Sequence, residues 1–179
     1  MRKLVLGLVG LSLIVGTALS AAPHVESFQL PGHGEVRLSV PERWVSRFTQ
    51  PPGEVPPTIT FAPKDGESFE VLITPVWRSG EDGTVYESGL RKQTEQAAAE
   101  AQSQAVEKTL ALKEISGTDG HGYYFTATDR APKPGEYKYM AQGMLKLGTL
   151  ALAFTVLSND GQAEVVGDAL QLLSTATRK

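Results

Sequence analysis

The sequence of 179 residues contains no cysteine. That absence excludes disulfide bonds, thiolate metal sites, cysteine nucleophiles and the lipid-modified cysteine of a bacterial lipoprotein. Histidine is scarce as well: His24, His33 and His121 show no HExxH pattern and no pair spaced on one helix. The sequence therefore predicts no metal site and no cofactor. We expect His121, which lies between Gly120 and Gly122, in a solvated turn.

Motifs of catalysis and nucleotide binding are missing too. There is no GxSxG or SxxK motif for a serine nucleophile, and no GxGxxG or Walker loop for phosphates. The 20 acidic residues allow many acid/base pairs, but the sequence favours none of them. We assign no catalytic residue and expect a non-enzymatic protein. The alternative is a periplasmic hydrolase whose acid/base pair is assembled only by folding.

The longest apolar run lies at the start of the chain. Arg2 and Lys3 precede the apolar segment 4–16, and small residues follow it, which is the pattern of a secretory signal peptide. The run is shorter than the roughly 20 residues that a membrane-spanning helix needs. We therefore predict a cleaved signal peptide at residues 1–20 and a periplasmic or secreted protein.

The expected mature protein is a single acidic domain. Cleavage after Ser20 fits the preference for small residues best, and a cut after Ala21 is the alternative. The remaining residues, 21–179, suit one domain. Loss of Arg2 and Lys3 takes the 17 basic residues to 15, against 20 acidic residues, so the net charge becomes −5. This charge disfavours nucleic acid and anionic membranes as partners. We expect no membrane insertion after signal removal, and a partner would be another periplasmic or envelope protein.

Alternating apolar and polar residues predict short strands joined by hairpins. Two-residue turns are expected at 65–66 and at Gly148-Thr149. The second turn predicts that Leu147 faces Leu150 across the hairpin. The expected strands are 28–30, 35–40, 58–62, 69–77, 110–116, 122–128, 137–147 and 150–157.

Two helices complete the predicted fold. Thr84 and Glu87 form a capping box, which opens a helix that extends to about Val106 with a buried stripe of mostly small residues. A final helix begins near Gly161. Because the expected sheet is apolar on both faces, each helix should cover one face. The predicted fold class is α+β: an antiparallel β-sheet covered by a long central helix and a C-terminal helix.

Four residues are candidates for a partner surface. Trp77 ends a predicted strand, where a half-exposed indole would mark a binding edge, and burial in the core is the alternative. Pro52 and Pro56 belong to a proline-rich segment that can form neither a helix nor a central strand. Tyr124 alternates with its aromatic neighbours and therefore points to the opposite face of its strand.

Three segments resemble the PsbP-like group of small exported bacterial proteins. They are GEVRLSVPERW (34–44), GHGYYFTATD (120–129) and LGTLALAFTVLSNDGQAEVVGDALQLLSTA (147–176). The resemblance spans nearly all of the chain after the signal peptide and depends on packing and turn residues. It implies an α/β/α sandwich and a non-enzymatic interaction module, with no catalytic residue to transfer. The function expected from the sequence is that of an exported accessory or protein-interaction domain.

Overall fold

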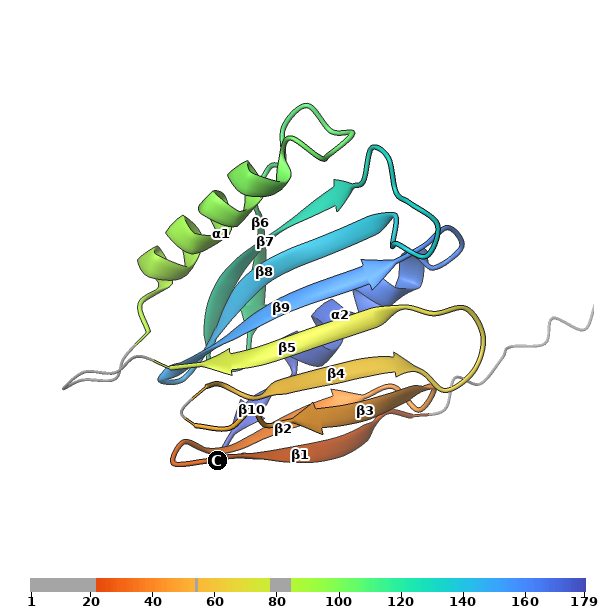
Figure 1. Cartoon of the computed structure of the whole chain (residues 1–179). Coiled ribbons are helices and arrows are strands. Elements are labelled where there is room, and N and C mark those ends of the chain that lie inside the picture. Colours follow the sequence, from red (N-terminus) through yellow and green to blue (C-terminus); the bar gives the residue numbers. More distant parts are fainter. Residues whose placement is uncertain (1–21, 54, 78–84) are drawn as a thin grey trace, which may run out of the picture.

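The computed structural model describes residues 22–53, 55–77 and 85–179 (Figure 1). The predicted signal peptide and Thr84 of the predicted capping box lie outside these residues. Of the described residues, 46% lie in strands and 18% in helices, so the protein is mostly β. The strands form one sheet of seven and one sheet of three.

The larger sheet is antiparallel and is built mainly from consecutive hairpins. Its strand order is β3-β4-β5-β9-β8-β7-β6. The chain leaves the sheet after β5 and returns at β6, and the later hairpin β8-β9 then brings β9 beside β5. Its strands are β3 (Trp44–Thr49), β4 (Thr58–Pro63), β5 (Glu70–Val76), β6 (Lys113–Gly117), β7 (Gly120–Thr128), β8 (Tyr139–Leu147) and β9 (Leu150–Ser158).

The main core lies on one face of this sheet. The smaller sheet and helix α2 (Ala163–Ser174) both pack on that face. The smaller sheet contains β1 (His24–Leu30), β2 (Gly34–Val40) and β10 (Thr177–Arg178) in the order β1-β2-β10. Burial of apolar side chains from all these elements supplies most of the driving force for folding. Large fully buried side chains of this core include Leu38, Trp44, Ile59, Phe61, Ile73, Leu152 and Leu172.

Helix α1 (Glu87–Ala101) covers only part of the opposite face. It packs on β7 and β8 (Figure 1), where Ala98 contacts a small apolar cluster with Phe125 and Ala127. Strands β3, β4 and β5 lie beyond the helix, and antiparallel sheets tolerate such a water-facing side when its residues are polar. In the described part of the chain, no helix has the length and apolar character needed to cross a membrane.

The predicted sandwich, with a long central helix over one whole face, is wrong. Helix α1 begins at Glu87 with Tyr86 as its N-cap and ends at Ala101, before the predicted end at Val106. Beyond it, the Val106 amide donates to the Thr128 carbonyl at the end of β7, so pairing with the sheet replaces helical hydrogen bonds. The first two predicted strands also form a separate sheet with β10, and this sheet shares with α2 the face that a helix alone was expected to cover.

The predicted register of the β8-β9 hairpin is confirmed. Leu147 faces Leu150 across the turn that Gly148 begins, and Gly148 has a φ of +61°, which glycine adopts without steric cost. The β4-β5 hairpin also forms, but residues 64–69 join its strands, so the two-residue turn predicted at 65–66 is wrong. Residues near Gly148 determined the β8-β9 register, so sequence reasoning was able to recover it.

Candidate binding groove

The uncovered part of the sheet face forms the floor of a groove beside α1. Across its strands, Thr74 of β5 faces Ala153 of β9, and Ala153 faces Met144 of β8. The hydroxyl oxygens of Thr58 and Thr74 are 3.0 Å apart, which continues the row onto β4. In the next row, Leu72 faces Thr155 and Thr155 faces Gln142. The floor is therefore a mixture of hydroxyl, amide and small apolar side chains.

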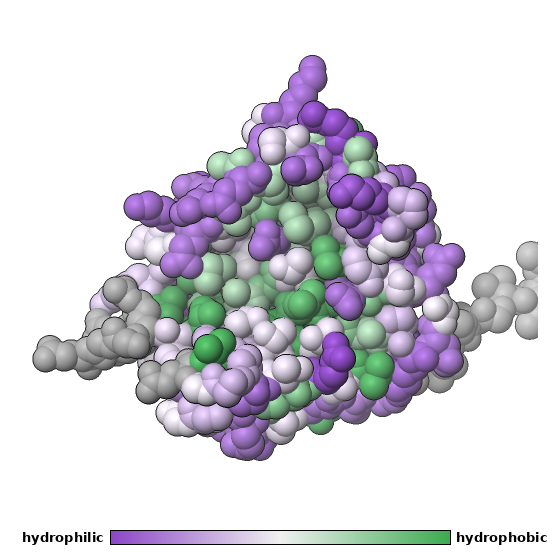
Figure 2. Space-filling view, in the orientation of Figure 1, coloured by the Kyte–Doolittle hydropathy of each residue, from purple (hydrophilic) through white to green (hydrophobic). Residues whose placement is uncertain are grey.

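The groove consists of two hollows. One, of about 450 Å³, lies above the strands and is bounded by Gln93, Thr94 and Ala97 of α1. The other, of about 490 Å³, lies at the start of α1 and is lined by Trp77 and Tyr86 among others. Gln93 and Met144 line both hollows, so the two are adjacent. Figure 2 shows this face, with pale and hydrophobic residues gathered at its centre and strongly hydrophilic residues mainly around it.

Small residues explain why the groove remains open. Ala98 allows α1 to approach β7 and β8 closely, which places the helix to one side of β9 and β5. Ala97 on the helix and Ala153 on the floor are too short to fill the space between them. The Thr94 hydroxyl donates to the Leu90 carbonyl at 2.8 Å within the helix, so this buried polar group is satisfied without a contact across the groove.

The described residues that line the groove carry no formal charge. None of the described residues lining either hollow is Asp, Glu, Lys, Arg or His. Threonine hydroxyls and glutamine amides both donate and accept hydrogen bonds, and apolar side chains lie between them. Each hollow also falls within the roughly 300–1,000 Å³ typical of ligand sites. This arrangement suits the binding of an uncharged molecule with both polar and apolar surfaces.

Of the four predicted surface residues, only Trp77 borders a hollow, and its side chain packs against the main core. Trp77 follows β5, is half-buried, and stacks on His33 with ring centroids 3.9 Å apart. Pro52 is exposed and Pro56 half-buried in the connection from β3 to β4, and neither lines either hollow. Tyr124 lies on the core side of the sheet, where it packs near Phe154.

Most of the groove was missed by sequence reasoning. Gln93, Thr74, Thr155 and Gln142 were not singled out, although a signal was present. Threonines recur at alternate positions of β4, and Thr74 and Thr155 each alternate with buried residues of their strands. That pattern predicts a polar outer face, but it does not show that a helix stands beside it.

His121 is the second residue of β7 and not part of the turn, which comprises residues 118–119. It is exposed, and its Nδ1 lies 3.2 Å from the Ser116 hydroxyl. The next residue, Gly122, allows β7 and β8 to pair closely, because a Cβ at this position would lie 2.1 Å from the Met144 carbonyl oxygen. Within the described ranges, no three His, Cys, Asp or Glu side chains are grouped so that they could hold a metal ion.

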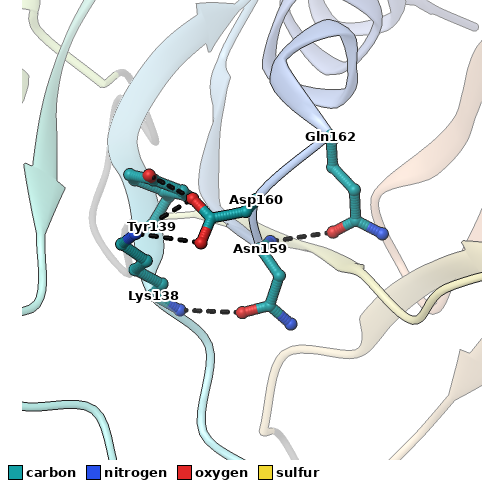
Figure 3. A network of polar contacts seen from close by, with 5 residues as sticks. All are labelled: Lys138, Tyr139, Asn159, Asp160 and Gln162. Carbon is teal, nitrogen blue, oxygen red and sulfur yellow. Dashed lines mark hydrogen bonds and ion pairs between the residues drawn. The ribbon is translucent and has the colours of Figure 1, made fainter.

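A separate hollow of about 390 Å³, outside the groove, lies near the start of α2. Two carboxylates, Glu107 and Asp160, are among the residues that line it. Asp160 accepts hydrogen bonds from the Tyr139 hydroxyl at 2.6 Å and from the Lys138 ammonium at 2.9 Å (Figure 3). The backbone amide of Lys138 donates to Asn159 Oδ1 at 3.1 Å. These contacts fasten the beginning of β8 to the loop that leads into α2.

Both carboxylates are stabilised in their charged form. The Tyr139 hydroxyl and the Lys138 ammonium hold the pKa of Asp160 below its ordinary value. Burial raises the pKa of Glu107, but hydrogen bonds from the amide and hydroxyl of Thr128 outweigh it and lower the pKa overall. An acid/base pair needs two groups whose pKa values are driven apart. This cluster therefore fits a structural role.

The Asp160 contacts predict a specific dependence of stability on pH. A carboxylate with a depressed pKa stabilises the fold above its unfolded value of about 3.9, and that contribution is lost as the pH falls through the folded pKa. We expect Asp160→Asn to reduce the difference in melting temperature between pH 7 and pH 3. Tyr139→Phe should act in the same direction, and the double variant should add less than the two single effects combined. Thermal unfolding that shows the wild-type pH dependence in Asp160→Asn would contradict the assignment.

No protein-family model matches the chain, and no curated protein or solved structure matches it either. The resemblance to the PsbP-like group therefore stays a prediction. The groove and its chemistry carry the functional argument.

Proposed function

We propose that this protein is an exported, non-enzymatic binding domain and that the groove beside α1 is its binding site. The observation that carries the proposal is the lining of the two adjacent hollows, in which the described residues are polar but uncharged or apolar. Acid/base catalysis requires a titratable group within hydrogen-bond reach of the reacting atoms, and the lining offers hydroxyls, amides and apolar side chains. Such a lining favours recognition over reaction.

The start of the sequence supports export as part of this proposal. Arg2, Lys3 and the apolar segment 4–16 support export to the periplasm or the medium. The expected net charge of −5 after signal removal disfavours nucleic acid as a ligand. The ligand would therefore be an envelope or extracellular component, and the protein would act as an accessory that holds it.

The hydrolase alternative is not favoured by the carboxylates that folding brings together. Glu107 and Asp160 line the same hollow region, but each accepts hydrogen bonds from neighbouring protein groups. Their lowered pKa values make both poor proton donors near neutral pH. We therefore propose no catalytic role for them.

The absence of cysteine offers a direct test of the groove. Gln93 and Gln96 are both exposed on α1, but only Gln93 lines the two hollows. Single variants Gln93→Cys and Gln96→Cys, each carrying an environment-sensitive fluorophore, form a matched pair. On titration with cell-envelope extract we expect a saturable change in emission at position 93 and none at position 96. Equal responses at the two positions, or no response at 93, would contradict the proposal.

A further inference from the structure

The geometry points to a second binding site: we infer that the hollow near the start of α2 binds a small aliphatic amine that also carries a hydroxyl group. We call this site the α2 hollow. It lies outside the groove, so the inference does not depend on the proposed function. Three features carry it: a hydroxyl without a partner, a carboxylate without a counter-charge, and an apolar wall.

Three hydroxyl side chains form a row across the sheet in the α2 hollow. Thr128 of β7 faces Tyr139 of β8, and Tyr139 faces Ser158 of β9, so all three lie on the same face of the sheet. The Thr128 hydroxyl donates to Glu107 at 2.7 Å, and the Tyr139 hydroxyl donates to Asp160 at 2.6 Å (Figure 3). The Ser158 hydroxyl has no hydrogen-bond partner among the described residues.

Ser158 is deeply buried, and its hydroxyl opens into the α2 hollow. The residue is 3% exposed and lines the hollow. Val156, two residues earlier on the same face of β9, belongs to the main core beneath α2. Among the described residues, the side-chain polar atoms that are both fully enclosed and unpartnered belong to His24 and Trp44, so Ser158 Oγ keeps some accessible surface. Polar groups this deeply buried normally have a partner, and a ligand hydroxyl would supply one.

Asp160 is already balanced within the protein. It precedes Gln162, the N-cap of α2, by two residues, and a negative charge near this end of a helix is favourable. The Lys138 ammonium also lies 2.9 Å from both of its carboxylate oxygens. Asp160 therefore contributes little net charge to the α2 hollow.

Glu107 is the carboxylate that lacks a counter-charge. Each of its oxygens accepts a hydrogen bond from Thr128, and no basic side chain of the described residues pairs with it. Lys113 donates to the Thr126 hydroxyl at 3.1 Å and forms no ion pair with Glu107. Burial raises the pKa of this carboxyl, but the hydrogen bonds from Thr128 lower it overall. The ionised carboxylate can therefore accept strong hydrogen bonds from an ammonium group.

The remaining wall fits the carbon chain of such a ligand. The volume of about 390 Å³ lies within the usual range of ligand sites. Thr128 and Ser158 are two strands apart, which corresponds to about 10 Å between their Cα atoms. A short amino alcohol can place its ammonium at Glu107 and its hydroxyl at Ser158. Its methylene groups then meet the apolar side chains Ala127, Met140, Ala163 and Val166.

The test uses the mature protein and three ligands of equal chain length, followed by chemical-shift titration. They are 5-aminopentan-1-ol, n-pentylamine and pentan-1-ol. We expect the amino alcohol to bind most tightly, because it satisfies both groups. Loss of the hydroxyl should weaken binding about threefold to tenfold, and loss of the ammonium about tenfold or more. Equal affinity for the three ligands, or no binding of the amino alcohol, would overturn the inference.

Two variants assign the contacts. Ser158→Ala removes no hydrogen bond to the described residues, so its melting temperature should not fall, and it should bind the amino alcohol and n-pentylamine equally well. Glu107→Gln keeps an acceptor for Thr128 but removes the charge, and should weaken amino alcohol binding about tenfold or more. Glu114→Gln makes the same change at an exposed position on β6 and should retain wild-type binding.

The remaining outcomes separate this site from a structural role and from the groove. A lower melting temperature in Ser158→Ala, with unchanged amino alcohol binding, would give Ser158 a structural role and overturn the inference. So would Nα-acetyllysine amide that binds as tightly as the amino alcohol, because the site would then select a peptide side chain. The amino alcohol should leave the emission of the labelled Gln93→Cys protein unchanged, whereas the response of that protein to envelope extract tests the groove alone.

Discussion

Gly122→Ala is expected to destabilise the protein by about 3 kcal/mol, near the upper end of the usual cost of overpacking. A Cβ at this position would lie 2.1 Å from the Met144 carbonyl oxygen and 2.6 Å from Leu145 Cα. Both atoms belong to the backbone of β8, so relief would require the paired strands β7 and β8 to separate. Glycine inside a strand often marks such a close approach. Urea denaturation followed by circular dichroism measures the change in unfolding free energy.

Gly167→Ala is the matched control. Gly167 lies in α2, and a Cβ there would meet nothing within 4 Å. In a helix this change should stabilise the protein by about 0.5–1 kcal/mol, because alanine loses less backbone freedom on folding. Opposite signs for the two alanine substitutions are the expected result. A neutral Gly122→Ala would show that the sheet can accommodate the side chain.

Trp44→Ala should cost about 3–5 kcal/mol, the range for removing a large buried aromatic side chain. Trp44 is fully buried at the start of β3. Its ring lies 5.1 Å from that of Phe69 and 6.1 Å from that of Phe61, measured between centroids. Removal of the ring leaves a cavity between β3, β4 and the start of β5. We expect these paired strands to close the cavity only in part. The lost stability is measured from the shift in denaturation midpoint.

Trp44→Phe separates volume from hydrogen bonding. The indole Nε1 is buried and has no hydrogen-bond partner among the described residues, so phenylalanine removes no hydrogen bond to them. We expect a cost well below that of alanine, because most of the buried apolar area is kept. If the two substitutions cost the same, filling the core is not the role of this side chain.

The hairpins illustrate what local sequence predicts well. Gly148 supplies the positive φ that the β8-β9 turn requires, and the alternation on either side then sets which residues face each other. The same reasoning recovered the β4-β5 hairpin and the opposite orientations of Tyr124 and Phe125. In each example the information lies within a few residues of the feature.

The extent of α1 shows where local reasoning fails. Its small-residue stripe continues beyond Ala101, yet the helix ends there. The side-chain amide of Gln102 donates to the Glu107 backbone carbonyl, and the side-chain oxygen of Gln102 accepts from the Leu110 backbone amide. Together with the bond from Val106 to Thr128, these contacts direct the chain onto the sheet. The bond to Thr128 depends on a strand some 20 residues later in the sequence, and the periodicity of the helix gives no information about that strand.

Charge, the lack of cysteine, the apolar segment 4–16, the β8-β9 turn and the strand periods were determined by the sequence itself, because each depends on composition or on near neighbours. The second sheet, the end of α1 and the groove were decided only by tertiary structure. The groove exists because α1 lies over β7 and β8 while Thr74 and Thr155 belong to strands outside its cover. Trp77 was visible as a candidate, but its contacts with His33 and the main core join separate elements, and the packing of those elements is a property of the whole fold.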